Sequence, residues 1–238
     1  GDERIYPASM TKIMTALLTI ENLPDLNETI TVPEDIFEEL TAQDASVAGF
    51  NPYEQPTVRD LLYGVLLPSG ADACETLARA VGGSEEGFVA MMNQKAEELG
   101  FTNTHFENCT GLHNDNHYST CRDIAVLMSE CLKSDTFREI VTREVYTTEA
   151  TASHPEGITL YDTMLHRFTS YEMSTTLENG AVIEGGKTGF TDEAGQCLVS
   201  FAEYGGEEYI LVTAEAMTDS GSAVDSIADA STVYGRLQ

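Results

Sequence analysis

Three short motifs contain residue types that can carry out nucleophilic chemistry at a carbonyl carbon. They are Ser9-Met10-Thr11-Lys12, Ser69-Gly70-Ala71 and Lys187-Thr188-Gly189. On a helix, Ser9 and Lys12 would share one face, so the lysine amine could reach the serine hydroxyl. A serine beside an uncharged lysine is a nucleophile paired with its base. At a helix start, unpaired N–H groups, that of Ser9 included, would also favour developing negative charge.

Lys12 can act as a base only if its pKa falls well below the ordinary value of about 10.4. Burial lowers the pKa of a lysine, and so does a second cation close by, for which Lys187 is the candidate. The formal net charge of −28 favours the ammonium form. Salt screens surface charge beyond about 8 Å, however, so we expect the local effects to prevail.

Taken singly, each motif has an ordinary structural explanation. In a chain of this length and composition, the number of matches expected by chance is roughly 0.25 for S-x-x-K and about 0.04 for K-T-G. Ser9 and Lys12 could be a capped helix start with a solvated lysine, Pro68-Ser69-Gly70 a simple turn, and Gly189 a strand bulge. The signal is that all three occur together in this order.

The composition indicates a globular chain with an acidic surface. The chain has 238 residues, 42% of them hydrophobic, with 12 Lys and Arg against 40 Asp and Glu. This charge argues against nucleic acids and anionic lipid surfaces as partners. No apolar run approaches the roughly 20 residues of a membrane span. Five cysteines, an odd number without metal-like pairing, argue against a disulfide scaffold, and no cofactor is implied.

Helical patterns dominate the first part of the chain, and strand patterns the second. We expect helices from Ser9 to Glu21, from Thr57 (capped with Asp60) to Leu67, over 71–81, from Ser84 to about Gly100, from Thr120 to Lys133 and over 223–237. Residues 22–56 are expected to form loops with short strands, including 28–32, and 101–118 to be turn-rich. Strands are expected over 143–151, 158–161, 196–204 and 208–216, the last two joined as a hairpin across Gly205-Gly206.

Longer stretches around the motifs resemble one family. These stretches are YPASMTKIMTALL, TVRDLLYGVLLPSGADA, LGFTNTHFENCTGLHNDNHYSTCRDIAVL and GGKTGFTDEAGQCLVSFA. They are similar to the serine-type D-alanyl-D-alanine carboxypeptidases, the low-molecular-mass penicillin-binding proteins of bacterial cell walls. The resemblance implies an α+β fold of the penicillin-binding protein and serine β-lactamase type, with an antiparallel sheet flanked by helices. It also implies one catalytic domain over 1–238 with an all-helical subdomain at roughly 24–140.

The same resemblance implies the reaction and a role for each motif. Ser9 would be the nucleophile and Lys12 its base, while Ser69, bonded to Lys187, would relay a proton to the leaving D-alanine amine. Thr188 would hold the terminal carboxylate of the substrate, and the N–H of Phe190, just after Gly189, would be the second oxyanion donor. The expected partners are peptidoglycan stem peptides ending in D-Ala-D-Ala and β-lactam antibiotics, met in the cell envelope outside the cytoplasmic membrane.

The chain departs from the family pattern at Ala71, where the family carries Asn. That amide is expected to bond the substrate's peptide carbonyl, and its loss leaves partners unpaired at a cost of about 1 to 3 kcal/mol. Ala71 therefore leaves open a non-catalytic protein that binds wall peptides or β-lactams, and the shared fold leaves open a β-lactamase. Because only eight residues precede Ser9, we also expect the sheet to lack the family's first strands, and we expect no C-terminal anchor in this chain.

A zinc site is the remaining interpretation to weigh. His113 and His117, with Asp115 between them, are residues that could bind zinc. They lie in a turn-rich segment, however, and lack the spacing that places two histidines on one helix face. We therefore expect no metal site.

Overall fold

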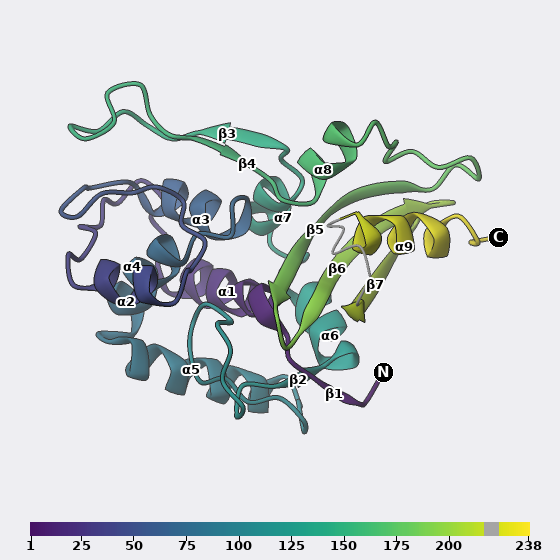
Figure 1. Ribbon diagram of the computed structural model, residues 1–238, viewed down its shortest axis with the longest axis horizontal. Coiled ribbons are helices and arrows are strands. Elements are labelled where there is room, and N and C mark those ends of the chain that lie inside the picture. The colour runs from purple at the N-terminus through teal and green to yellow at the C-terminus, as the bar shows by residue number, and fades with distance from the viewer. Residues whose placement is uncertain (217–223) are drawn as a thin grey trace.

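An antiparallel sheet and a group of helices meet along the first long helix of the chain (Figure 1). The computed structural model describes residues 1–216 and 224–238. Its helices are the 3-10 helix η1 (Ala8–Thr11) and the α-helices α1 (Lys12–Asn22), α2 (Ile36–Ala42), α3 (Val58–Leu66), α4 (Ala71–Gly82), α5 (Glu85–Glu98), α6 (Cys121–Cys131), α7 (Asp135–Val141), α8 (Leu165–Ser170) and α9 (Asp225–Tyr234). Its strands are β1 (Arg4–Ile5), β2 (Ser119–Thr120), β3 (Val145–Thr147), β4 (Thr159–Tyr161), β5 (Val182–Thr191), β6 (Gly195–Tyr204) and β7 (Glu207–Ala216).

The main sheet consists of β5, β6 and β7 in consecutive antiparallel order. The predicted hairpin between β6 and β7 is confirmed. Gly205 and Gly206 form its turn at φ angles of 63° and 84°, which glycine adopts without a Cβ clash. Helix α9 packs on β6 and β7 (Figure 1). Strand β5 is an edge strand, and η1 packs against it, so the first and third motifs come together here.

Helix α1 runs through the centre of the helical group. It packs against α3, α4, α5, α6 and α7, and every side chain from Lys12 to Thr19 is buried. Polar groups inside such a helix need partners. The Thr19 hydroxyl donates to the Thr15 carbonyl at 2.8 Å, and the Thr15 hydroxyl to the Cys109 carbonyl at 2.6 Å. The residues at the start of α1 are therefore held by neighbours on all sides.

The predicted helix caps are confirmed. Thr57 and Asp60 form both hydrogen bonds of a capping box at the start of α3. The side chains of Ser84 and Thr120 each accept a backbone N–H at the starts of α5 and α6. These bonds satisfy donors that the first turn of a helix leaves free, and they fix where the three helices begin.

The expectation of loops and short strands over 22–56 is wrong in part. Helix α2 lies there, and 28–32 is not a regular strand, although a bridge from Thr29 to Thr57 and further backbone hydrogen bonds join it to 53–58. Helix α2 buries Ile36 and Leu40, one turn apart, and two apolar positions are too few to establish a helical period in the sequence.

Other boundaries also shift in the second half of the chain. Helices α7 and α8 are not anticipated by the sequence patterns. The strand expected over 143–151 is confined to β3, which pairs with β4 in a separate ribbon. The expected helix over 223–237 is α9, and Ala223 lies outside the described residues. The boundaries of a helical subdomain near 24 and 140 remain a prediction.

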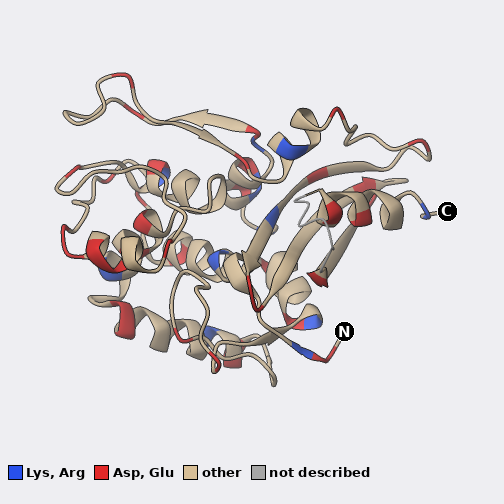
Figure 2. Ribbon diagram, viewed as in Figure 1, with Lys and Arg blue, Asp and Glu red and all other residues tan. Residues whose placement is uncertain are grey.

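Acidic residues predominate in the structure, as the excess of Asp and Glu in the composition implies. Figure 2 shows acidic positions spread over outer helices, loops and the β3–β4 ribbon, with few basic positions between them. Within residues 1–216 and 224–238, no helix has both the length and the apolar character needed to cross a bilayer.

Candidate active site

Ser9 and Lys12 lie in contact at the junction of η1 and α1. Lys12 Nζ lies 2.9 Å from Ser9 Oγ and donates to the Thr110 carbonyl at 2.7 Å. The lysine is only 3% exposed, so bulk water does not compete for its amine. The predicted pairing of a serine with a lysine one turn later is therefore present in the structure.

The lysine pair has the electrostatics that a neutral amine requires. Burial lowers the pKa of Lys12, while the nearby Cys74, Cys109 and Asp72 act in the opposite direction. Burial, followed by the charge of Lys12, lowers the pKa of Lys187 to about 7. Because repulsion between two ammonium groups is mutual, each lysine disfavours protonation of the other. Burial and this repulsion both favour the uncharged amine.

Two glycines fix the backbone around the serine. Ala8 has a φ of +46°, a strained angle for a residue with a side chain. A Cβ added at Gly111 would overlap the Ala8 carbonyl, and one at Gly189 would lie 3.1 Å from the Ser9 nitrogen. The loop around Gly111 and strand β5 thus approach the Ser9 backbone from two directions. Gly189 is among the predicted site residues. Gly111 is not, although its left-handed φ of +83° explains why glycine is needed there.

Ser69 lies in the turn between α3 and α4 and is both strained and unpaired. Its φ is +67°, it is 6% exposed, and its buried Oγ has no hydrogen-bond partner. The predicted bond between Ser69 and Lys187 is absent, because Lys187 Nζ donates instead to the Thr188 carbonyl at 3.0 Å. A buried unpaired hydroxyl costs about 1 to 3 kcal/mol, and strain combined with an orphan group is typical of functional positions.

Asp72 holds the turn that carries Ser69, and sequence reasoning did not identify it. Its buried carboxylate accepts the N–H groups of Ala48, Gly49 and Phe50 at 2.7 to 3.0 Å. Burial raises its pKa, and these three bonds oppose the shift. Ala71, the adjacent residue, is 1% exposed and offers only a methyl group. Asp72 therefore joins segment 48–50 to the first turn of α4, directly after the turn, and position 71 brings no side-chain amide to the site.

A short segment before α8 connects this turn to β5. The Thr163 N–H donates to the Leu67 carbonyl at 3.1 Å, and its hydroxyl lies 2.6 Å from that of Thr188. Asp162 accepts the N–H groups at the start of α8, and burial raises its pKa to about 7. Phe190, at the end of β5, is 57% exposed. Neither Asp162 nor Thr163 belongs to a recognisable motif, which is why both were missed.

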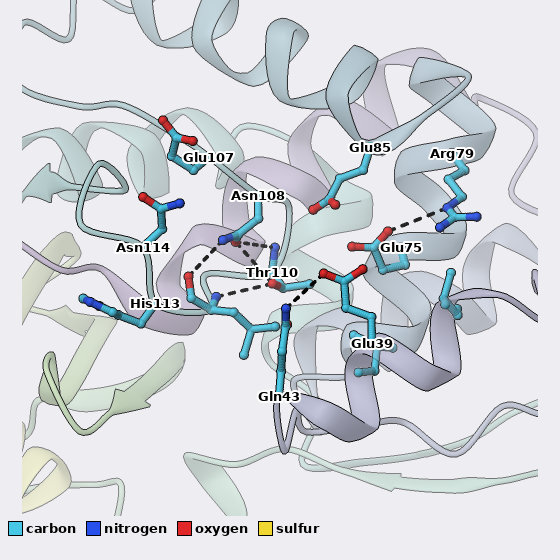
Figure 3. Close-up of a pocket in the computed structure, with 13 residues that line it drawn as sticks. Glu39, Gln43, Glu75, Arg79, Glu85, Glu107, Asn108, Thr110, His113 and Asn114 are labelled. Atoms are coloured by element: carbon cyan, nitrogen blue, oxygen red, sulfur yellow. Dashed lines mark hydrogen bonds and ion pairs between the residues drawn. The ribbon is translucent and has the colours of Figure 1, made fainter.

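A cavity of about 440 Å³ is lined by residues of α2 and α4 and by the loop that contains Thr110 (Figure 3). Glu75 and Glu85 face each other in it, and burial together with Glu85 raises the pKa of Glu75 to about 8. The two histidines weighed as zinc ligands lie apart: His113 lines this cavity, whereas His117 is bonded to Thr11.

Comparison with known proteins places this geometry in a family. The family model for D-alanyl-D-alanine carboxypeptidase, peptidase S11, matches residues 1–218. The chain is 35% identical over 219 residues to the D-alanyl-D-alanine carboxypeptidase DacF of Bacillus subtilis, covering 92% of this chain and 53% of that protein. It is 36% identical over 218 residues to the D-alanyl-D-alanine carboxypeptidase of Streptomyces sp. K15, covering 88% and 72%.

Solved structures agree with the sequence comparison. The Streptomyces K15 DD-transpeptidase superposes with a TM-score of 0.82 at 32% identity, covering 98% of this chain and 88% of that one. This confirms the predicted fold of the penicillin-binding protein type. The chain spans about half the length of DacF and of the Escherichia coli relative DacC, since the matches cover 53% and 52% of those proteins. On this evidence the chain belongs to the peptidase S11 family of D-alanyl-D-alanine carboxypeptidases.

Proposed function

We propose that this chain is a serine D,D-carboxypeptidase that removes the terminal D-alanine from peptidoglycan stem peptides. The observation that carries the proposal is the 2.9 Å approach of Ser9 Oγ to a buried lysine amine whose pKa is lowered. Family membership supports the same reaction. Since peptidoglycan lies outside the cytoplasmic membrane, the proposed place of action is the cell envelope.

The proposed reaction has two steps. Lys12 takes the hydroxyl proton of Ser9 while the oxygen attacks the carbonyl carbon of the penultimate D-alanine. The peptide C–N bond then breaks, and the leaving amine takes a proton relayed through Ser69. Water attacks the acyl-serine ester, the Ser9 hydroxyl re-forms, and the shortened peptide leaves. A β-lactam would acylate Ser9 in the same way.

The remaining site residues would stabilise charge. The N–H groups of Ser9 and Phe190 are the proposed oxyanion donors, and the close packing of Gly189 on the Ser9 backbone supports that assignment. Lys187 and Thr188 would bind the carboxylate at the end of the substrate, as a cation beside a hydroxyl suits an anion. The orphan hydroxyl of Ser69 would gain its partner from the substrate or from Lys187 once the site is occupied.

The test combines two assays on the wild-type protein and on Ser9→Ala. A fluorescent penicillin should label the wild type in stoichiometric amount, with the adduct mapped by mass spectrometry to the peptide that contains Ser9. An acyl-D-Ala-D-Ala peptide should release D-alanine. Ser9→Ala should lose both activities, and retention of either in that variant would overturn the assignment.

Ala71 motivates a second candidate, a non-catalytic protein that binds wall peptides. Without an amide at this position the site lacks one bond to the substrate's peptide carbonyl. This candidate predicts peptide binding with no D-alanine release. Rapid steady-state hydrolysis of a chromogenic cephalosporin would instead indicate a β-lactamase. Transfer of the acyl group to an added amine would indicate the activity named for the Streptomyces K15 structure.

A further inference from the structure

His117 is a buried histidine that the proposed chemistry does not use. It is 2% exposed and lies at the end of the loop that follows α5. Its Nε2 lies 2.8 Å from the hydroxyl of Thr11, the buried residue immediately before Lys12. Its Nδ1 accepts the backbone N–H of Glu107 at 3.2 Å. Both ring nitrogens are therefore bonded within the protein.

The bond at Nδ1 fixes the tautomer of the ring. A neutral imidazole has one acceptor nitrogen and one donor nitrogen, so a ring that accepts at Nδ1 donates from Nε2. The acceptor of the Nε2–H hydrogen bond is the Thr11 hydroxyl oxygen. Burial lowers the pKa of His117 to about 3, and its titratable neighbours His105, His113 and Lys12 act in the same direction. The ring thus remains a neutral donor over the whole range in which the protein would work.

Three hydrogen bonds connect segment 109–117 to the end of η1 and the first turn of α1. His117 bonds Thr11 at 2.8 Å, Lys12 donates to the Thr110 carbonyl at 2.7 Å, and the Thr15 hydroxyl donates to the Cys109 carbonyl at 2.6 Å. The carbonyl that orients the Lys12 amine therefore belongs to the segment that His117 anchors. Loss of the His117 bond would detach the other end of that segment from Thr11, the residue next to Lys12.

We propose that His117 is a positioning residue for Lys12, an inference that rests on the proposed function of Ser9 and Lys12. By donating to Thr11, the ring holds the junction of η1 and α1 in register with segment 109–117. The Lys12 amine is thereby kept between the Ser9 hydroxyl and the Thr110 carbonyl. The ring does not touch the reacting atoms, so its effect on the reaction passes through Thr11.

Two substitutions separate the two bonds of the ring. In His117→Gln the amide nitrogen can replace Nε2 as donor to Thr11, whereas the bond from Glu107 is lost. In His117→Asn the amide oxygen can replace Nδ1 as acceptor from Glu107, whereas the bond to Thr11 is lost. Both variants bury one side-chain amide at position 117, so they have the same polar group and differ by one methylene. Thr11→Val and Thr11→Ser form a second pair at the other end of the bond.

The readouts are the second-order rate of acylation by a fluorescent penicillin as a function of pH, and the melting temperature. We expect His117→Asn and Thr11→Val to lower acylation at neutral pH by about tenfold or more, since displacements near 1 Å are costly in catalysis. The rise of their acylation rate with pH should shift to higher pH, because a misplaced Lys12 amine is better solvated and its pKa rises. In His117→Gln and Thr11→Ser the acylation rate should stay within about threefold of the wild-type rate, and the pH midpoint should be that of the wild type.

A purely structural role predicts a different pattern. In that case acylation would follow the folded fraction in all four variants, with an unchanged pH midpoint, and the proposal would be overturned. If the wild type is not acylated at all, the proposed function fails instead. NMR titration of the Lys12 side chain in the wild type and in His117→Asn then decides the positioning role by itself: a higher Lys12 pKa in the variant supports it, and an equal one overturns it.

Discussion

The two sides of the site differ in how completely their polar atoms are paired. On the side of α1, Lys12 bonds Ser9 and Thr110, and Thr11 bonds His117. On the opposite side, Ser69 Oγ is buried without a partner, and Lys187 donates only to a neighbouring carbonyl among the bonds seen. The proposed nucleophile and base are therefore organised before substrate arrives. The side that would receive the leaving group and carboxylate is left incomplete, as expected if the substrate supplies the missing partners.

The largest effect is expected at the base itself. Lys12→Arg keeps a cation but removes the lone pair, because a guanidinium cannot deprotonate in a protein. Acylation by penicillin should fall by about 10³-fold or more. Lys133→Arg, at an exposed lysine, is the matched control and should acylate like the wild type. Near-normal acylation by Lys12→Arg would mean that another group activates Ser9.

The next effect tests the close packing around the nucleophile. Gly111→Ala places a Cβ against the Ala8 carbonyl, so the backbone that leads into Ser9 must move. We expect acylation to fall by about 10²-fold. Gly100→Ala is the control, because Gly100 has nearly the same φ, +79°, with no atom within 4 Å of an added Cβ. Gly100→Ala should lose only about 1 to 2 kcal/mol of unfolding free energy, from the strain of an alanine in the left-handed region, and it should be acylated normally. Equal acylation in both variants would remove the packing argument.

A smaller effect is expected on the incomplete side. Ser69→Ala deletes a hydroxyl that has no partner in the free protein, so acylation should fall by about 10²-fold or less while the melting temperature stays equal or rises. Ser200→Ala is the control for deletion of a paired hydroxyl, since Ser200 lies 3.1 Å from the Tyr234 hydroxyl and that variant should be destabilised. A destabilised Ser69→Ala would show that Ser69 is a structural residue.

The smallest effect concerns the pH profile. In the proposed mechanism Lys12 must lose its proton for acylation to begin, so the rate should rise with pH, whereas the Lys187 ammonium that would bind a carboxylate is lost above its pKa of about 7. The Asp162 carboxylate raises that pKa, so Asp162→Asn should move the falling limb to lower pH and reduce acylation several-fold above neutrality. The Asn oxygen can still cap α8. An unmoved falling limb would show that Lys187 does not control it.

Residue patterns in the sequence predicted most of the elements that position the site. Caps at Thr57, Ser84 and Thr120 and the β6–β7 hairpin were predictable because each depends on neighbours within a few residues. Helix α2 was not, because its seven residues bury too few side chains to establish a period.

The site was predictable in its motifs and not in its supports. Ser9 and Lys12 are separated by one helical turn, so local geometry alone brings them together. Asp72, Gly111 and Thr163 act through contacts with segments far away in the chain, and no local pattern encodes those contacts. The expected bond between Ser69 and Lys187 was wrong for the same reason, since it depends on how two distant segments meet.

The most direct test of the central claim is a measurement of the lysine pKa values. The chain contains only four lysines, so selective ¹³C labelling gives a side-chain NMR spectrum with four signals to assign. Single Lys→Arg variants identify each signal. Two signals, those of Lys12 and Lys187, should titrate well below the ordinary value of about 10.4. A Lys12 signal that titrates near 10.4 in the free protein would contradict the assignment of its amine as the base that activates Ser9.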